Sequence, residues 1–163
     1  MTASRPARFA RETLASRLGA ALLALGVAAP VLATVWTRAT VRTRVAKGGS
    51  VAIDDVSYAG RDWNAALTAL EVRQTGSAGV GNVATTWTFR YTNTDREPHY
   101  VALAVACLDS GGRERFRFKA NATLLADRPG GGTIDVGVKM REGDWSATAV
   151  AKVVVDFLSS PEG

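Results

Sequence analysis

From about residue 50 onward, apolar and polar residues alternate along the chain. In residues 83–93, Trp87, Phe89 and Tyr91 fall on one side of an extended chain, and threonines and Arg90 fall on the other. A period of two is typical of a β-strand with one buried face. Seven such runs occur, at residues 51–58, 67–74, 83–93, 100–108, 113–125, 134–140 and 147–158. Seven short strands without a long amphipathic helix among them predict an antiparallel β-sandwich.

The polar segments between these runs have the composition of turns. Residues 109–112, Asp-Ser-Gly-Gly, predict a tight hairpin, because Asp favours the first turn position and Gly tolerates a positive φ. Residues 93–98, 127–132 and 142–144 are also expected to be turns. The start of the second run has an alternative, since residues 62–67 are compatible with a short helix that has Asp62 as its N-cap.

Three of these features occur in a recognisable order. They are the segment Thr88-Phe89-Arg90-Tyr91-Thr92-Asn93-Thr94-Asp95, the run 101–108 with its Asp-Ser-Gly-Gly hairpin, and Pro129-Gly130-Gly131 before another alternating run. This order resembles the bacterial extracytoplasmic Ig-like domains of the FxLYD kind. The resemblance implies an Ig-like fold and an exported, often membrane-tethered accessory role, and it transfers no functional residues.

The N-terminal part has a different pattern. Residues 18–37 contain no charged residue and follow Arg5, Arg8, Arg11 and Arg17, which predicts a hydrophobic targeting helix and an extracytoplasmic location. Its richness in Ala and Gly, with Pro30 before Val31-Leu32-Ala33, favours a signal peptide that is cleaved after Ala33. Retention of residues 18–37 as a transmembrane anchor is the alternative, because 20 apolar residues can span a bilayer.

The expected organisation is therefore a signal peptide or membrane anchor at 1–33, a basic linker at 34–49 and the Ig-like sandwich at 50–163. Four of the 20 basic residues but only one of the 15 acidic residues lie in the first 33. The exported part is nearly balanced in charge, so nucleic acid is not an expected partner. A periplasmic or secreted protein fits this organisation, tethered to the membrane if the helix is retained.

Few residues are candidates for chemistry. Cys107 has no second cysteine for a disulfide, and its place in an apolar run indicates a buried side chain. His99, beside Pro98, is expected to be a solvated surface residue. No metal site or other cofactor is expected, and a small enzyme or metal-dependent hydrolase that uses His99 with carboxylates is kept as the alternative function.

Basic residues supply the candidate binding surface. In run 113–125, Arg113, Arg115, Arg117 and Lys119 are expected on one strand face, with Arg90 on a neighbouring strand and Glu114 on the opposite face. Such a row is either a solvated, aggregation-resistant face or a docking surface for an acidic partner. The sequence therefore predicts a non-enzymatic binding or assembly module of the cell envelope. Its expected partner is an envelope protein or an acidic surface, which includes the membrane.

Overall fold

The computed structural model describes residues 35–54, 56–60 and 64–158, and these residues are almost entirely β-structure. The predicted targeting segment 1–33 and its predicted cleavage site lie outside the described residues. Nine strands are described: β1 (Val35–Arg44), β2 (Gly49–Ala52), β3 (Val56–Gly60), β4 (Ala65–Ser77), β5 (Asn82–Asn93), β6 (His99–Leu108), β7 (Glu114–Leu124), β8 (Arg128–Arg141) and β9 (Val150–Leu158). One short helix, α2 (Glu142–Ala147), precedes β9. No helix in the described part is long and apolar enough to cross a membrane.

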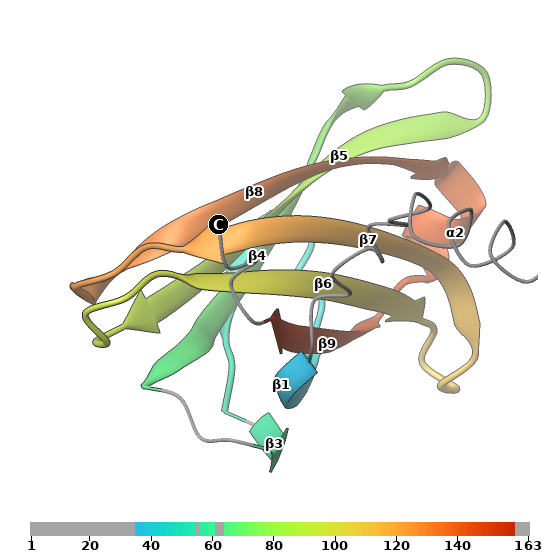
Figure 1. Ribbon diagram of the computed structural model, residues 1–163. Coiled ribbons are helices and arrows are strands. Elements are labelled where there is room, and N and C mark those ends of the chain that lie inside the picture. Colours follow the sequence, from blue (N-terminus) through green and yellow to red (C-terminus); the bar gives the residue numbers. More distant parts are fainter. Residues whose placement is uncertain (1–34, 55, 61–63, 159–163) are drawn as a thin grey trace, which may run out of the picture. The chain divides into compact units, whose positions relative to one another are not determined.

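The strands form two antiparallel sheets that face each other (Figure 1). One sheet has five strands in the order β3-β1-β9-β6-β7, and the other has four in the order β2-β4-β5-β8. The hairpins β4–β5 and β6–β7 stay within one sheet, whereas the connections β5–β6, β7–β8 and β8–β9 cross to the other. The prediction of an antiparallel β-sandwich is confirmed at this level.

The core lies between the sheets because alternate side chains of each strand point inward. Trp87 and Phe89 of β5 are fully buried, as are Val105 of β6 and Val153 of β9. Trp87 also packs edge to face on Phe118 of β7, with ring centroids 5.1 Å apart. The alternation that predicted these strands therefore results from one face of each strand being buried.

Two strands were not predicted. Val35–Arg44, expected to belong to a basic linker, form β1, which lies between β3 and β9 in the five-stranded sheet. The predicted first run 51–58 is divided into β2, which ends at Ala52, and β3, which begins at Val56. The described sandwich therefore has nine strands instead of about seven, and its N-terminal strand is an interior strand of a sheet.

The ends of β8 also differ from the prediction. Residues 128–132, expected to be a turn, already pair with the end of β5. Pro129 is tolerated there because β8 is an edge strand, where a missing N–H group need not break a ladder bond. Residues 142–144 begin helix α2 instead of forming a simple turn, and the last strand begins at Val150.

The corner between β5, β7 and β8 is held by two buried side chains. The Tyr91 hydroxyl accepts a hydrogen bond from the Leu125 backbone N–H at 3.1 Å. The Asn93 side chain donates to the carbonyl oxygens of Glu97 and Leu124 and accepts from the Asp95 N–H, at 3.0–3.1 Å. These bonds satisfy polar groups where the chain leaves one sheet for the other.

Candidate anion-binding face

The outer face of the five-stranded sheet collects basic side chains from three strands. The inward residues of these strands are buried, so the alternate residues point away from the core. Six basic and two acidic side chains belong to this face among the described residues: Arg38, Arg42 and Arg44 on β1, Lys152 and Asp156 on β9, and Glu114, Arg117 and Lys119 on β7. The near-neutral charge of residues 34–163 therefore conceals a basic face.

The strand registers align these cations in rows across the sheet. Arg42 is opposite Lys152, Lys152 is opposite Ala106, and Ala106 is opposite Arg117. In the next row, Val154 and Lys119 lie on either side of Ala104. Because alanine side chains are short, β6 forms a low floor between longer side chains on β9 and β7.

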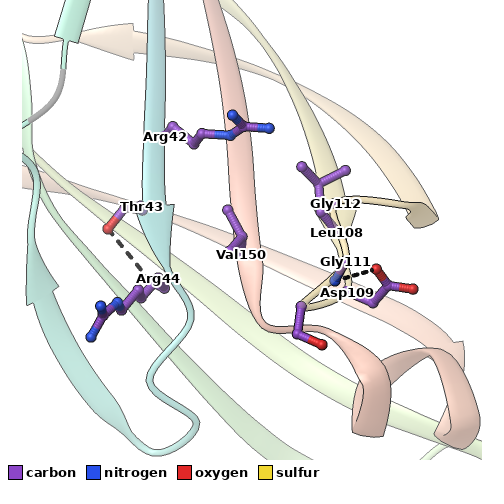
Figure 2. A pocket seen from close by; sticks show the side chains of 9 residues that line it. Arg42, Thr43, Arg44, Leu108, Asp109, Gly111, Gly112 and Val150 are labelled. Carbon is purple, nitrogen blue, oxygen red and sulfur yellow. Dashed lines mark hydrogen bonds between the residues drawn. The ribbon is translucent and has the colours of Figure 1, made fainter.

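This floor belongs to a concave part of the face. One depression of about 370 Å³ is lined by Arg42, Lys152, Arg117, Glu114, Val154, Leu108, Gly112, Ala104 and Ala106. A second, of about 460 Å³, adjoins it at the β6–β7 hairpin and shares Arg42, Leu108 and Gly112. Figure 2 shows that Arg42 extends across β9 toward Leu108 and the hairpin, whereas Arg44 points away from them.

The predicted hairpin forms the open end of the depression. The Asp109 N–H donates to the Arg113 carbonyl, and the Asp109 carboxylate accepts from the N–H groups of Gly111 and Arg113 at 2.9–3.0 Å. Gly112 has φ +81°, which L side chains rarely adopt. The tip therefore carries no side chain at Gly111 or Gly112 that could close the depression.

Carboxylates neutralise part of the basic face. Arg38 donates to Asp156 through Nε at 2.5 Å and Nη2 at 3.0 Å, and Arg117 donates to Glu114 at 2.9 and 2.6 Å. The second pair holds the pKa of Glu114 below and that of Arg117 above its ordinary value, mainly through the hydrogen bonds between them. No described carboxylate forms an ion pair with Arg42, Arg44, Lys119 or Lys152. These four charges remain available to a partner.

The structure divides the predicted row of basic residues. A register shift between Cys107 and Leu108 leaves Arg115 as an extra residue in β7, and Arg115 pairs with Asp144 of α2 at 3.7 Å. The same shift explains why Glu114, expected on the opposite face, contacts Arg117. Arg113 is exposed in the hairpin, before β7 begins. Of the row, Arg117 and Lys119 remain together on the outer face.

Arg90 does not join them. It lies on β5, in the other sheet, where its side chain points outward 3.9 Å from Glu71. The expectation that Arg90 lies on a strand next to the row is wrong, because the β5–β6 connection crosses between the sheets. The sequence analysis missed Arg42 and Lys152. For Arg42 a signal was present, because alternation in residues 37–44 puts it on the strand face that does not carry the buried Val41.

His99 is buried instead of solvated. Its side chain is 7% exposed, and its Nε2 lies 2.6 Å from Oδ2 of Asp95. Asp95 also accepts a hydrogen bond from Asn64 at 2.8 Å, and its pKa is lowered mainly by the bond with His99. Among the described residues, no group of three or more His, Cys, Asp or Glu side chains is arranged to hold a metal ion.

Cys107 is buried, as the sequence predicted, with 0% exposure. Burial, followed by the charges of Glu114 and Asp144, raises the pKa of its thiol to about 12. A thiol with so high a pKa is almost entirely protonated at neutral pH and is a poor nucleophile.

Comparisons with known proteins give no relatives. No family model, no curated protein and no solved structure matches this chain.

Proposed function

We propose that this protein is an exported, non-enzymatic module of the cell envelope that binds an anionic partner through the outer face of its five-stranded sheet. The observation that carries the proposal is the cluster Arg42, Lys152 and Lys119, which has no ion-pair partner among described carboxylates. Arg42 and Lys152 face each other across adjacent strands, and like charges in this position destabilise a sheet slightly, so this pair does not serve the fold. A binding role accounts for the presence of these unpaired cations on the outer face.

The strand order supports an Ig-like domain. In an Ig sandwich, two paired strands of one sheet are each followed in sequence by a strand of the other sheet, and these two following strands also pair. Here β5 pairs with β8 in one sheet, and the strands that follow them, β6 and β9, pair in the other. In this assignment β1 occupies the place next to β9 that the last strand of an Ig domain normally has. We therefore propose an Ig-like arrangement with the N-terminal strand in the last position, and the resemblance to FxLYD-type domains stays a prediction.

Export is supported by the charge-free residues 18–37 and the arginines before them. Cleavage after Ala33 leaves β1 intact, since β1 begins at Val35. A retained anchor would have to end before Val35, where the strand starts. We expect mass spectrometry of the exported protein to give Thr34 as its first residue; recovery of residues 18–34 in a carbonate-resistant membrane fraction would contradict cleavage.

The alternative of a His99-dependent hydrolase has less support. His99 is buried against Asp95 and faces Phe157 of the core, with ring centroids 6.2 Å apart. The depression with basic residues lies on the outer face of the sheet, whereas His99 points inward from β6.

The binding proposal is tested in cells. Epitope-tagged protein is recovered from the envelope fraction and washed with increasing salt, before and after the double change Arg42→Gln and Lys152→Gln. We expect salt to release the wild type and the double variant to leave the envelope at lower salt, because exposed charges are screened. The Lys139→Gln variant is the control, since Lys139 is an exposed cation on β8 of the other sheet. Equal retention of the wild type and the double variant at every salt concentration would refute the proposal.

A further inference from the structure

The depression on the outer face forms a short groove over β6, between residues of β9 and β7. Its floor consists of Ala104 and Ala106, which are alternate outward residues of an interior strand. Lys119 and Arg117 stand on one side, and Val154 and Lys152 stand on the other. Neighbouring strands are about 4.8 Å apart, so the two sides are separated by roughly 10 Å at the backbone. A groove of this width accommodates one extended chain.

Cations stand on both sides of this groove at Ala106, whereas the β9 side continues with Val154 and then Asp156, which is paired with Arg38. Arg117 and Lys119 are two residues apart on β7, a distance of about 7 Å along a strand. Lys152 faces them from β9, and Arg42 extends across β9 toward the hairpin end (Figure 2). A linear polymer with repeated negative charges would meet Lys152 and Arg42 on one side of the groove and Arg117 and Lys119 on the other. Gly111 and Gly112 carry no side chain that would block the hairpin end, although the Asp109 carboxylate lines the adjoining depression there.

The floor of the groove is unsuited to a polypeptide. The backbone of β6 already pairs with β7 on one side and with β9 on the other. A peptide chain in the groove would bring N–H and C=O groups for which alanine side chains offer no partner. An acidic peptide is therefore a poorer fit than a polymer whose polar atoms are mainly anionic oxygens.

Two other anionic partners also fit less well. Single-stranded nucleic acid is usually held by aromatic platforms in addition to cations, and Tyr100 is the one aromatic residue among the described outward side chains of β6, β7 and β9. A bilayer surface is flat, so it would contact the rims of the groove and leave the floor uncovered. Arg42 and Arg117 also carry guanidinium groups, which match phosphate oxygens in a bidentate geometry.

We propose that the groove over β6 binds one linear, base-free phosphate polymer, held by Arg42, Arg117, Lys119 and Lys152. This inference rests on the proposed function and specifies the class of its anionic partner. Glu114 limits the affinity, because it occupies the guanidinium of Arg117 through two hydrogen bonds.

The test is calorimetric titration of the purified protein with inorganic polyphosphate as the probe, at low and at physiological salt. We expect binding that weakens with salt with a logarithmic slope of about −2 to −3, as for three or four neutralised phosphates on a single chain. Arg42→Gln and Lys152→Gln should each weaken binding about three- to tenfold. Lys139→Gln, which removes the same charge from the other sheet, should leave the affinity within about twofold.

Glu114→Gln should raise the affinity for polyphosphate, so it distinguishes an effect on binding from a loss of folding. It frees Arg117 and removes a negative charge from the groove, so polyphosphate should bind about three- to tenfold more tightly. An unfolded or damaged variant would not show a gain. Circular dichroism and the unfolding temperature verify that each variant is folded.

Several outcomes would overturn the proposal. The first is the absence of polyphosphate binding at low salt, and the second is an equal loss of affinity in Lys139→Gln, which would indicate a response to net charge alone. Tighter binding of polyglutamate, single-stranded DNA or phosphatidylglycerol vesicles would assign the face to a peptide, a nucleic acid or a membrane. If salt-sensitive envelope retention still depends on Arg42 and Lys152 while polyphosphate fails to bind, the anion-binding function stands and the polymer class is wrong.

Discussion

Replacement of Gly132 by alanine should destabilise the sandwich through a clash with one ring. A Cβ atom built on Gly132 would lie 2.5 Å from Cζ, 2.6 Å from the hydroxyl oxygen and 2.8 Å from Cε1 of Tyr91. The Tyr91 side chain is 2% exposed and is held in place by its hydrogen bond from the Leu125 N–H. The ring must move by about 1 Å to reach ordinary van der Waals contact, and that movement breaks or weakens this bond.

The expected cost follows from these two effects. Overpacking of a well-filled core typically costs about 1–3 kcal/mol, and the loss of one buried hydrogen bond costs about 0.5–1.5 kcal/mol more. The free energy of unfolding of Gly132→Ala should therefore fall by about 2–4 kcal/mol. Urea denaturation followed by tryptophan fluorescence measures this change, because Trp87 is fully buried in the same core.

Gly130 provides a matched control in the same strand. A Cβ atom built there has no neighbour within 4 Å, so Gly130→Ala should change the free energy of unfolding by about 0.5 kcal/mol or less. A second control removes the obstacle: in a Tyr91→Leu background, Gly132→Ala should cost less than in the wild type, which is a favourable coupling. Equal stability of Gly132→Ala and Gly130→Ala would refute the steric argument.

Two further predictions concern buried polar groups. With a pKa of about 12, Cys107 holds roughly 10³-fold less thiolate at pH 8 than an ordinary cysteine. A maleimide should therefore label it only after denaturation, and rapid labelling of the native protein would contradict burial. Cys107→Ser should lower the free energy of unfolding by about 1–3 kcal/mol. The pKa of Asp95 is lowered in the folded protein, so its stabilising effect is fully present above its ordinary pKa, near 3.9, and is lost as the pH falls through the lower folded value. The stability difference between the wild type and Asp95→Asn should accordingly shrink in acid urea titrations, and a constant difference from pH 6 to pH 3 would rule out this linkage.

The sequence predicted the strands whose two faces differ most in polarity. β5 and β7 have aromatic or aliphatic residues at every second position because one face lies in the core, and that contrast is visible without a structure. β1 was missed because its arginines follow an apolar segment and were attributed to a basic linker, although Val41 and Ala39 between them are core residues. The start of β8 was missed because edge strands tolerate proline and glycine, which normally indicate turns.

The arrangement of the basic residues could not be predicted in the same way. It depends on which strands pair, and a strand's own sequence does not specify its neighbours. The register shift beside Leu108 sends Arg115 to α2 and brings Glu114 to Arg117, which reverses the expected faces of both residues. Arg42 and Lys152 are opposite each other because β1 pairs with β9, strands from the two ends of the described chain.

This pairing also separates recognition from stability. Arg42 and Lys152 face each other across adjacent strands without a carboxylate partner, a contact that costs a few tenths of a kcal/mol. Each replacement by glutamine should therefore leave the free energy of unfolding unchanged or slightly higher. If Arg42 and Lys152 served only to prevent aggregation, replacing either of them should affect anion binding no more than replacing Lys139 on the other sheet. A loss of anion binding confined to Arg42 and Lys152, without a loss of stability, would show that the position of these charges matters more than their number.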